Sequence, residues 1–130
     1  MRVVFDTNIY VSALTFPGSS ADRAIRRILD GRDTLLISKP LLDELLTVLA
    51  RKFSRDADAL SRTALFLTEL AEVVHPKDPV NVFKDEPDNR VLECAIAGQA
   101  RAIVTGDKAM LAVEISHGVR IMSLSAYLHR

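Results

Sequence analysis

The sequence predicts a single α/β domain over residues 1–130, built in three layers with helices on both faces of a mostly parallel sheet of about five strands. Short apolar runs rich in β-branched residues alternate along the chain with segments whose apolar residues recur at helical spacing. Strands that alternate with helices are joined by right-handed crossovers and pair in parallel. A chain of 130 residues that is 48% apolar can bury one continuous core, and no linker divides it.

The first part of the chain predicts one strand and two helices. Residues 3–5 are β-branched and aromatic and stop at Asp6, as a buried strand stops at a polar sheet edge. A helix over residues 8–14 is broken by the Pro-Gly-Ser-Ser turn at 17–20. The segment 21–29 places its apolar residues on one face, which indicates a second helix.

The middle of the chain predicts a second strand and two longer helices. The strand covers residues 35–37, Ser38 is the expected cap of the next helix, and Pro40 suits its first turn. Glu44 lies beside the apolar stripe of this helix, and therefore near the edge of the core. A further amphipathic helix follows over residues 58–70.

The last part completes the alternation. Val73 and Val74 predict a third strand, and the proline-rich and charged segment 76–87 predicts a surface loop that ends where a helix begins, near Asp88. The remaining elements are a strand over residues 102–104, a short helix, a strand over residues 119–122 and a short helix near the C-terminus.

Charge, cysteine content and hydropathy limit the partners and the cellular location that can be expected. The 17 basic and 17 acidic side chains cancel, so any nucleic-acid contact is expected to be local or metal-mediated. Cys94, the only cysteine, cannot form an intramolecular disulfide and fits a reducing compartment, where it is expected to be a core residue. Asp6 interrupts the position where a signal peptide would be apolar, and no window is apolar enough to span a bilayer. We therefore expect a soluble, cytoplasmic protein without membrane contact.

Four carboxylates are expected at one edge of the sheet. Asp6 and Asp107 each follow a predicted strand directly, and the carboxyl ends of parallel strands share an edge where ligands bind. Asp88 and Glu44 come from helices that the fold turns toward the same rim. Taken singly, each aspartate is also explained as a helix cap or first-turn residue, and Glu44 as a solvated helix residue. Four acids from four separated segments favour a functional site.

The chemistry of this set predicts a divalent cation. Oxygen-only ligands without a histidine or cysteine cluster suit Mg²⁺ or Mn²⁺ and exclude a structural zinc site. Such an ion supports hydrolysis of a phosphodiester, because it lowers the pKa of bound water and neutralises phosphate charge. Thr7, Asn8 and Thr105 are expected to orient the carboxylates. The basic residues expected to position RNA phosphates near this rim are Lys39, Lys84, Arg90 and Lys108.

Four segments of the chain resemble the PIN-domain nucleases, in the order in which that family carries them. They are Val-Val-Phe-Asp-Thr-Asn at residues 3–8, Glu44, Asp-Glu-Pro-Asp-Asn-Arg-Val-Leu-Glu at residues 85–93, and Ile-Val-Thr-Gly-Asp at residues 103–107. In particular, the chain is similar to the PIN-type (VapC-like) toxins of prokaryotic toxin–antitoxin systems. This resemblance implies a Mg²⁺- or Mn²⁺-dependent endoribonuclease that forms a homodimer and is inhibited by a cognate antitoxin protein. The acidic site of the family carries over to Asp6, Glu44, Asp88 and Asp107.

Two positions depart from the family pattern. Relatives often carry another aspartate where this chain has Ala109, which predicts weaker binding of a second metal ion. Pro87 stands where many relatives have an acid, so Asp85 becomes the auxiliary carboxylate of that loop, ranked below the main four.

Three other protein classes share features with this chain. A phosphatase of the haloacid dehalogenase type needs an aspartate where Asn8 stands, and a response-regulator receiver domain needs one after the third strand, where Val74 and His75 stand. This chain therefore lacks a residue that each of these two classes requires. The third class stays open: a non-catalytic PIN-fold protein-interaction module, which would tolerate the loss of Asp6 and Asp107 and show no metal dependence.

Overall fold

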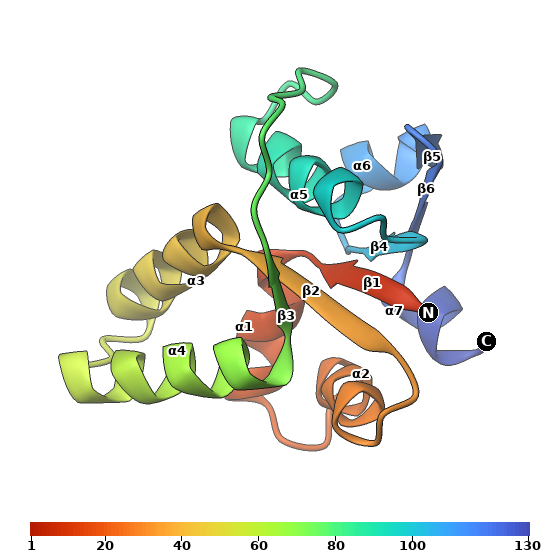
Figure 1. Cartoon of the computed structure of the whole chain (residues 1–130). Coiled ribbons are helices and arrows are strands. Elements are labelled where there is room, and N and C mark those ends of the chain that lie inside the picture. The colour runs from red at the N-terminus through yellow and green to blue at the C-terminus, as the bar shows by residue number, and fades with distance from the viewer.

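The structure is a computed structural model that describes residues 1–130. Its strands form one sheet in the order β3-β2-β1-β4-β6-β5, in which all neighbours are parallel except β5 and β6. Figure 1 shows β1 inside the sheet, flanked by β2 and β4. The strands are β1 (Arg2–Phe5), β2 (Thr34–Ser38), β3 (Glu72–Val74), β4 (Ala102–Val104), β5 (Ile115–Ser116) and β6 (Val119–Met122).

Helices cover both faces of this sheet. α5 packs against β1, β2 and β4 on one face, and α1, α2 and α7 lie on the other (Figure 1). Right-handed crossovers that step from β1 toward β3, and then back from β3 to β4, leave their helices on opposite sides. The helices are α1 (Thr7–Thr15), α2 (Ser20–Leu29), α3 (Lys39–Lys52), α4 (Ala57–Leu70), α5 (Glu86–Ala97), α6 (Lys108–Val113) and α7 (Leu124–Leu128). None of them combines the length and the apolar character that a membrane span requires.

The predicted three-layer α/β/α architecture is confirmed, with one additional strand. β5 pairs antiparallel with β6 across a turn at His117 and Gly118, whose φ angles are 51° and 79°. A strand of two residues carries too short a pattern to be recognised, and His-Gly is not among the dipeptides that usually signal such a turn. α5 begins at Glu86, slightly before the predicted start near Asp88, because Pro87 is well suited to the first helical turn.

The two central strands of the sheet, β1 and β4, determine where Asp6 and Asp107 lie. Val3, Val4 and Phe5 of β1 are 0% exposed, so the strand is fully enclosed between the two helical layers. Between β1 and β4 the connections change direction and their helices change face, and α/β sheets bind ligands at the carboxyl ends of the strands at such a point. Asp6 and Asp107 follow these two strands, and both therefore lie at that edge of the sheet.

Candidate functional site

Asp6 lies at the carboxyl end of β1 and is 8% exposed. Its backbone N–H donates to the carbonyl of Val104 over 3.0 Å, which extends the pairing of β1 with β4 by one residue. Its carboxylate accepts a hydrogen bond of 2.7 Å from the backbone N–H of Thr7 and another of 2.7 Å from the hydroxyl of Thr105. The side chain is thus held by the first residue of α1, which it caps, and by the buried threonine that follows β4.

Thr105 also fixes the second aspartate. Its hydroxyl oxygen accepts the backbone N–H of Asp107 over 3.0 Å, while the carboxylate of Asp107 accepts the N–H of Met110 over 3.0 Å and caps α6. The single hydroxyl of Thr105 therefore contacts Asp6 with its hydrogen and Asp107 with its oxygen. The predicted orienting role of Thr105 agrees with these contacts.

Glu44 reaches the same edge from α3. Its carboxylate accepts a hydrogen bond of 3.2 Å from the hydroxyl of Thr7, so Thr7 contacts Asp6 through its backbone and Glu44 through its side chain. Burial raises the pKa of Glu44, and the charges of Asp6 and Asp85 raise it further, although the Thr7 hydrogen bond opposes this. Asn8, which was also expected to orient the acids, is exposed and makes no side-chain hydrogen bond to them.

Asp88, in the first turn of α5, is the electrostatic centre of the group. The residue is 7% exposed, and no hydrogen bond to its carboxylate offsets that burial. Burial raises its pKa to about 7, and the charges of Asp107, Asp6, Asp85 and Glu44 act in the same direction. The four predicted acids therefore lie near enough to sense one another, although they come from four separate segments.

Asp85 is a fifth carboxylate at this edge. It occupies the N-cap position of α5, but its side chain makes no capping hydrogen bond and stays exposed. Its charge raises the pKa of Asp6, Glu44 and Asp88, which places it closer to the group than its lower rank in the sequence suggested. The sequence signal for this position was the Asp-Glu-Pro-Asp order, in which Asp85 and Asp88 are one helical turn apart.

The arrangement fits a hard cation in its chemistry but is not closed around one. No three of the acidic side chains come close enough together to share one metal ion in this structure. The donor set consists of carboxylate and hydroxyl oxygens, which are the ligands that Mg²⁺ and Mn²⁺ prefer. Burial raises the pKa of Asp6, Asp88 and Glu44, so each resists ionisation, and a nearby cation would stabilise the charged forms of all three.

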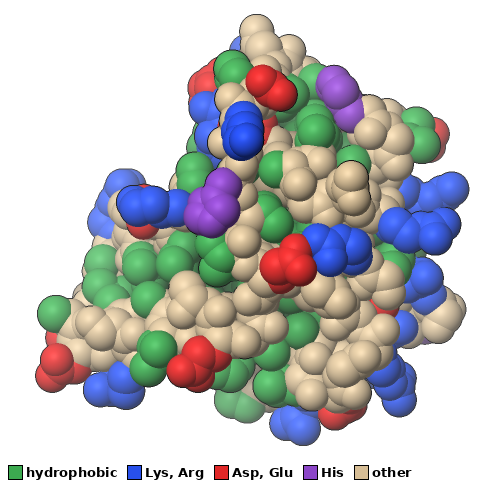
Figure 2. Space-filling view, in the orientation of Figure 1, with side chains coloured by type: hydrophobic (Ala, Val, Ile, Leu, Met, Phe, Trp, Pro, Cys, Tyr) green, Lys and Arg blue, Asp and Glu red, His purple; other side chains and the backbone are tan.

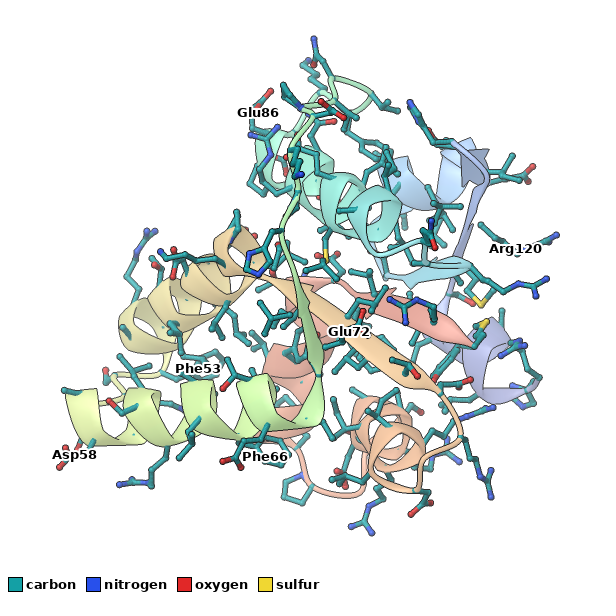
Figure 3. All side chains as sticks on the ribbon, in the orientation of Figure 1. Phe53, Asp58, Phe66, Glu72, Glu86 and Arg120 are labelled. Carbon is teal, nitrogen blue, oxygen red and sulfur yellow. The ribbon has the colours of Figure 1, made fainter.

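A shallow hollow of about 240 Å³ adjoins Glu44 and lies between the first turns of α3 and α5. Pro40 and Pro87 line it on either side, together with Glu86 and Arg90. Figure 3 shows Glu86 projecting from the start of α5 at the outer surface. The hollow thus places apolar ring surface and charged groups beside Glu44.

The basic residues predicted to position phosphates divide into two kinds. Lys39 forms an ion pair with Asp43, and Arg90 forms ion pairs with Glu86 and Glu93, so these two cations already have carboxylate partners. Lys84 and Lys108 are exposed and make no ion pair. Of the four predicted residues, only these two remain free to meet an anion.

Asn89 is a structural support of the site that the sequence did not reveal. It is 0% exposed, accepts hydrogen bonds from the backbone N–H groups of Val82 and Phe83, and donates one to the carbonyl of Phe83. The side chain thereby attaches the loop before α5 to the helix that carries Asp88. An asparagine beside Asp88 carries no periodic or capping signal, so only the structure identifies this role.

Comparison with known proteins gives one family and one sequence relative. A family model described as a PIN domain matches residues 2–109. An uncharacterized protein of Methanocaldococcus jannaschii is 26% identical over 117 residues, which cover 87% of this chain and 75% of that protein. The match to the family model includes all four predicted acids and Asp85.

Solved structures share the fold at low sequence identity. The structure of VapBC-1 from nontypeable Haemophilus influenzae aligns with a TM-score of 0.65 at 16% identity, over 96% of this chain and 99% of the other. The structure of VapBC2 from Rickettsia felis, bound to a DNA fragment from their promoter, aligns with a TM-score of 0.64 at 16% identity, over 95% and 98%. PAE2754 from Pyrobaculum aerophilum aligns with a TM-score of 0.59 at 18% identity, over 99% and 87%.

Proposed function

Because this chain belongs to the PIN-domain family, we propose that it is a metal-dependent endoribonuclease that hydrolyses RNA phosphodiester bonds and serves as the toxin of a toxin–antitoxin pair. One observation carries the nuclease part of the proposal. Asp88 is surrounded by the charges of Asp107, Asp6, Asp85 and Glu44, at the edge of the sheet where α/β folds bind ligands. Burying several carboxylates together is unfavourable unless protons or a cation compensate them.

Asp6, Glu44, Asp88 and Asp107 would hold Mg²⁺ or Mn²⁺. When bound, such an ion activates water and neutralises charge on a phosphodiester. The chain itself contributes orientation: Thr105 and Thr7 hold the oxygens of Asp6, and the cap of α6 holds Asp107. The hollow between Pro40 and Pro87 would receive the sugar and base next to the reacting phosphate.

The test is cleavage of a mixed, structured RNA by the purified protein in Mg²⁺, in Mn²⁺ and in EDTA. Asp6→Asn is the test variant, and Asp43→Asn is its matched control, because Asp43 neighbours Glu44 in sequence but pairs with Lys39 at the exposed surface. We expect cleavage that needs metal, disappears in D6N and persists in D43N. Equal cleavage by D6N and wild type, or cleavage in EDTA, would refute the proposal and indicate a contaminating nuclease.

A protein partner is part of this proposal. Phe53, Leu65 and Phe66 are 40%, 60% and 38% exposed, and Figure 3 shows Phe53 and Phe66 on the α3–α4 side of the molecule. Contact with a second copy would remove such apolar surface from water, so we propose a homodimer through these helices.

The cognate antitoxin is proposed from the resemblance to PIN-type toxins and from the fold shared with two VapBC structures. A cytoplasmic location follows from an RNA substrate and from the single, buried Cys94.

The alternative is a PIN-fold interaction module without catalysis. The exposed side chains of Phe53, Leu65 and Phe66 suit that function equally well, so binding of a protein partner does not separate the two. The metal-dependence experiment does, because a module without catalytic purpose predicts identical behaviour of wild type and D6N. Light scattering of the purified chain at several concentrations tests the homodimer independently of both.

A further inference from the structure

The amino edge of the sheet, opposite to the acids, carries a group of arginines. Arg101 precedes β4 and Arg120 lies in β6, and the backbone N–H of Arg120 donates to the carbonyl of Arg101 over 3.0 Å. The two residues, with Arg130, line a hollow of about 250 Å³. In Figure 3, Arg120 lies beside the chain ends, on the side of the molecule away from Glu86.

A second hollow has a volume of about 260 Å³. It lies along α2 and is lined by Arg23, Arg26, Arg27 and Arg32, with Asp30 as its only acid. Residues near the end of the chain contribute to both hollows, since Leu128 lines this one and Arg130 lines the other. Figure 2 shows the corresponding side of the molecule bordered by basic side chains. We call this surface the arginine face, and it consists of Arg23, Arg26, Arg32, Arg101, Arg120 and Arg130.

Most of these charges have no partner within the chain. Arg26 pairs with Asp22, but Arg23, Arg32, Arg101 and Arg120 form no ion pair. Like charges gathered around each hollow repel one another, and a polyanion would relieve that repulsion. The chain as a whole has no net charge, so the arginines gathered here reflect an uneven distribution of charge over the surface and not a basic composition.

Arg27 differs from the arginine face and shows what a structural arginine looks like in this chain. Its guanidinium lies 4.8 Å from the ring centroid of Tyr127 and donates to the carbonyls of Tyr127 and Leu128. It also lies 3.7 Å from the carboxylate of Asp33. These contacts attach α7 to α2. Arg101 and Arg120 make no such contacts, so packing does not explain their side chains.

We propose that the arginine face is a second RNA contact, which binds backbone phosphates without reading the sequence. Guanidinium groups bind phosphate oxygens through paired N–H donors, and phosphate contacts position a nucleic acid without specifying its bases. The four residues of β1 separate the two edges by about 13 Å at 3.3 Å per residue, a distance that a few nucleotides can span. The inference rests on the proposed function only for the identity of the polyanion.

The experiment measures RNA binding with cleavage switched off. Fluorescence anisotropy of an end-labelled, mixed-sequence single-stranded RNA is recorded in EDTA, from 50 to about 300 mM salt. The test variant is Arg101→Ser/Arg120→Ser, and the control is Arg51→Ser/Arg62→Ser, which removes two exposed arginines without ion pairs from α3 and α4. Loss of two phosphate contacts should weaken binding on the order of tenfold near 0.1 M salt and reduce the slope of log K against log salt by about 1.4.

The outcomes separate this inference from the proposed nuclease activity. A weaker, less salt-dependent complex for R101S/R120S with an unchanged R51S/R62S supports the arginine face, whether or not the protein cleaves RNA in Mg²⁺. Equal losses in both variants would overturn it, because overall charge would then be responsible. It is also overturned if the wild type does not bind RNA, or if R101S/R120S changes only the binding of vesicles that contain anionic lipid.

Discussion

The hydroxyl of Thr105 donates to the carboxylate of Asp6 over 2.7 Å and connects the ends of two neighbouring strands inside a fully buried contact. Asp6 is thereby held in one orientation at the place where β1 ends and α1 begins. The same contact lowers the pKa of Asp6, against the larger effect of burial, which raises it. Geometry and protonation of this acid therefore depend on one neighbouring hydroxyl.

Thr105→Val should destabilise the protein and impair the site together. The substitution keeps the shape of the side chain but leaves a buried carboxylate oxygen without its donor, which costs about 1–3 kcal/mol of unfolding free energy. Metal-dependent cleavage should fall as well, because Asp6 is freer to rotate and harder to ionise. Urea unfolding and RNA cleavage measure the two effects. Thr105→Ser retains the hydroxyl and should behave nearly as wild type, so equal damage in T105S and T105V would contradict this account.

Asp88 predicts that the metal-free protein loses stability as the pH rises. Its pKa is about 7 in the folded protein, against an ordinary value of 3.8, so between these values the folded state binds the proton more tightly than the unfolded state. This stabilisation is complete below about pH 3.8 and is lost as the pH rises through about 7. In EDTA, the melting temperature should therefore fall from pH 5 to pH 8.

Asp88→Asn tests the origin of that pH dependence. The variant should melt at a higher temperature than wild type at pH 8 and show a flatter pH profile, although the raised pKa values of Asp6 and Glu44 leave some slope. Mg²⁺ should raise the melting temperature of the wild type more at pH 8 than at pH 5, because protons and metal compete for the same carboxylates. Identical profiles for D88N and wild type would show that another group is responsible.

Asn89→Ala should loosen the loop before α5. The variant loses three hydrogen bonds to the backbone of Val82 and Phe83, at about 1 kcal/mol each, and leaves the buried N–H of Phe83 and the partly buried N–H of Val82 without acceptors. We expect a loss of about 3 kcal/mol in urea unfolding and faster amide exchange in the loop. Asn81→Ala is the control, because Asn81 is exposed in the same segment and should change stability by less than about 0.5 kcal/mol.

Gly98→Ala should strain the packing of α5 on the sheet. A Cβ atom at this position would lie 2.6 Å from Cδ1 of Leu36 and 3.1 Å from Cγ1 of Val74. Leu36 is fully buried and cannot move aside freely, so we expect a cost of about 1–3 kcal/mol. Calorimetry should show a lower melting temperature than for Gly106→Ala, whose Cβ would meet nothing within 4 Å. Recovery of stability in the double variant G98A/L36V would confirm the clash.

The sequence predicted the architecture well because its signals are local. Pro40 and the Pro-Gly-Ser-Ser turn mark where helices begin and end, and the positions of Asp6 and Asp107 after apolar runs indicated a shared edge. What depends on contacts between distant segments was out of reach. An orienting role for Thr105 was predicted, but not that its single hydroxyl contacts both Asp6 and Asp107. Nor could the sequence indicate that the N-cap position of Asp85 is left without a hydrogen bond, or that Asn89 supports the loop.

The basic residues predicted near the acids show the same limit, because their ion pairs could not be predicted from the sequence. Lys39 and Arg90 belong to the predicted rim, but each meets an acid one helical turn away in its own helix and is neutralised there. The arginine face was not predicted, because its residues are far apart in the sequence. Its members are scattered between residues 23 and 130, and only the folded chain brings them to one side.

The capping contacts of Asp6 and Asp107 have an evolutionary consequence. Both aspartates cap the start of a helix, so, contrary to the expectation from the sequence, selection for folding alone would favour keeping them even in a non-catalytic relative. Glu44 and Asp88 close no helix, and Asp88 makes the metal-free protein less stable at neutral pH and above. In homologues without catalytic activity, Glu44 and Asp88 would be substituted first. Their retention would therefore distinguish active homologues from inactive ones.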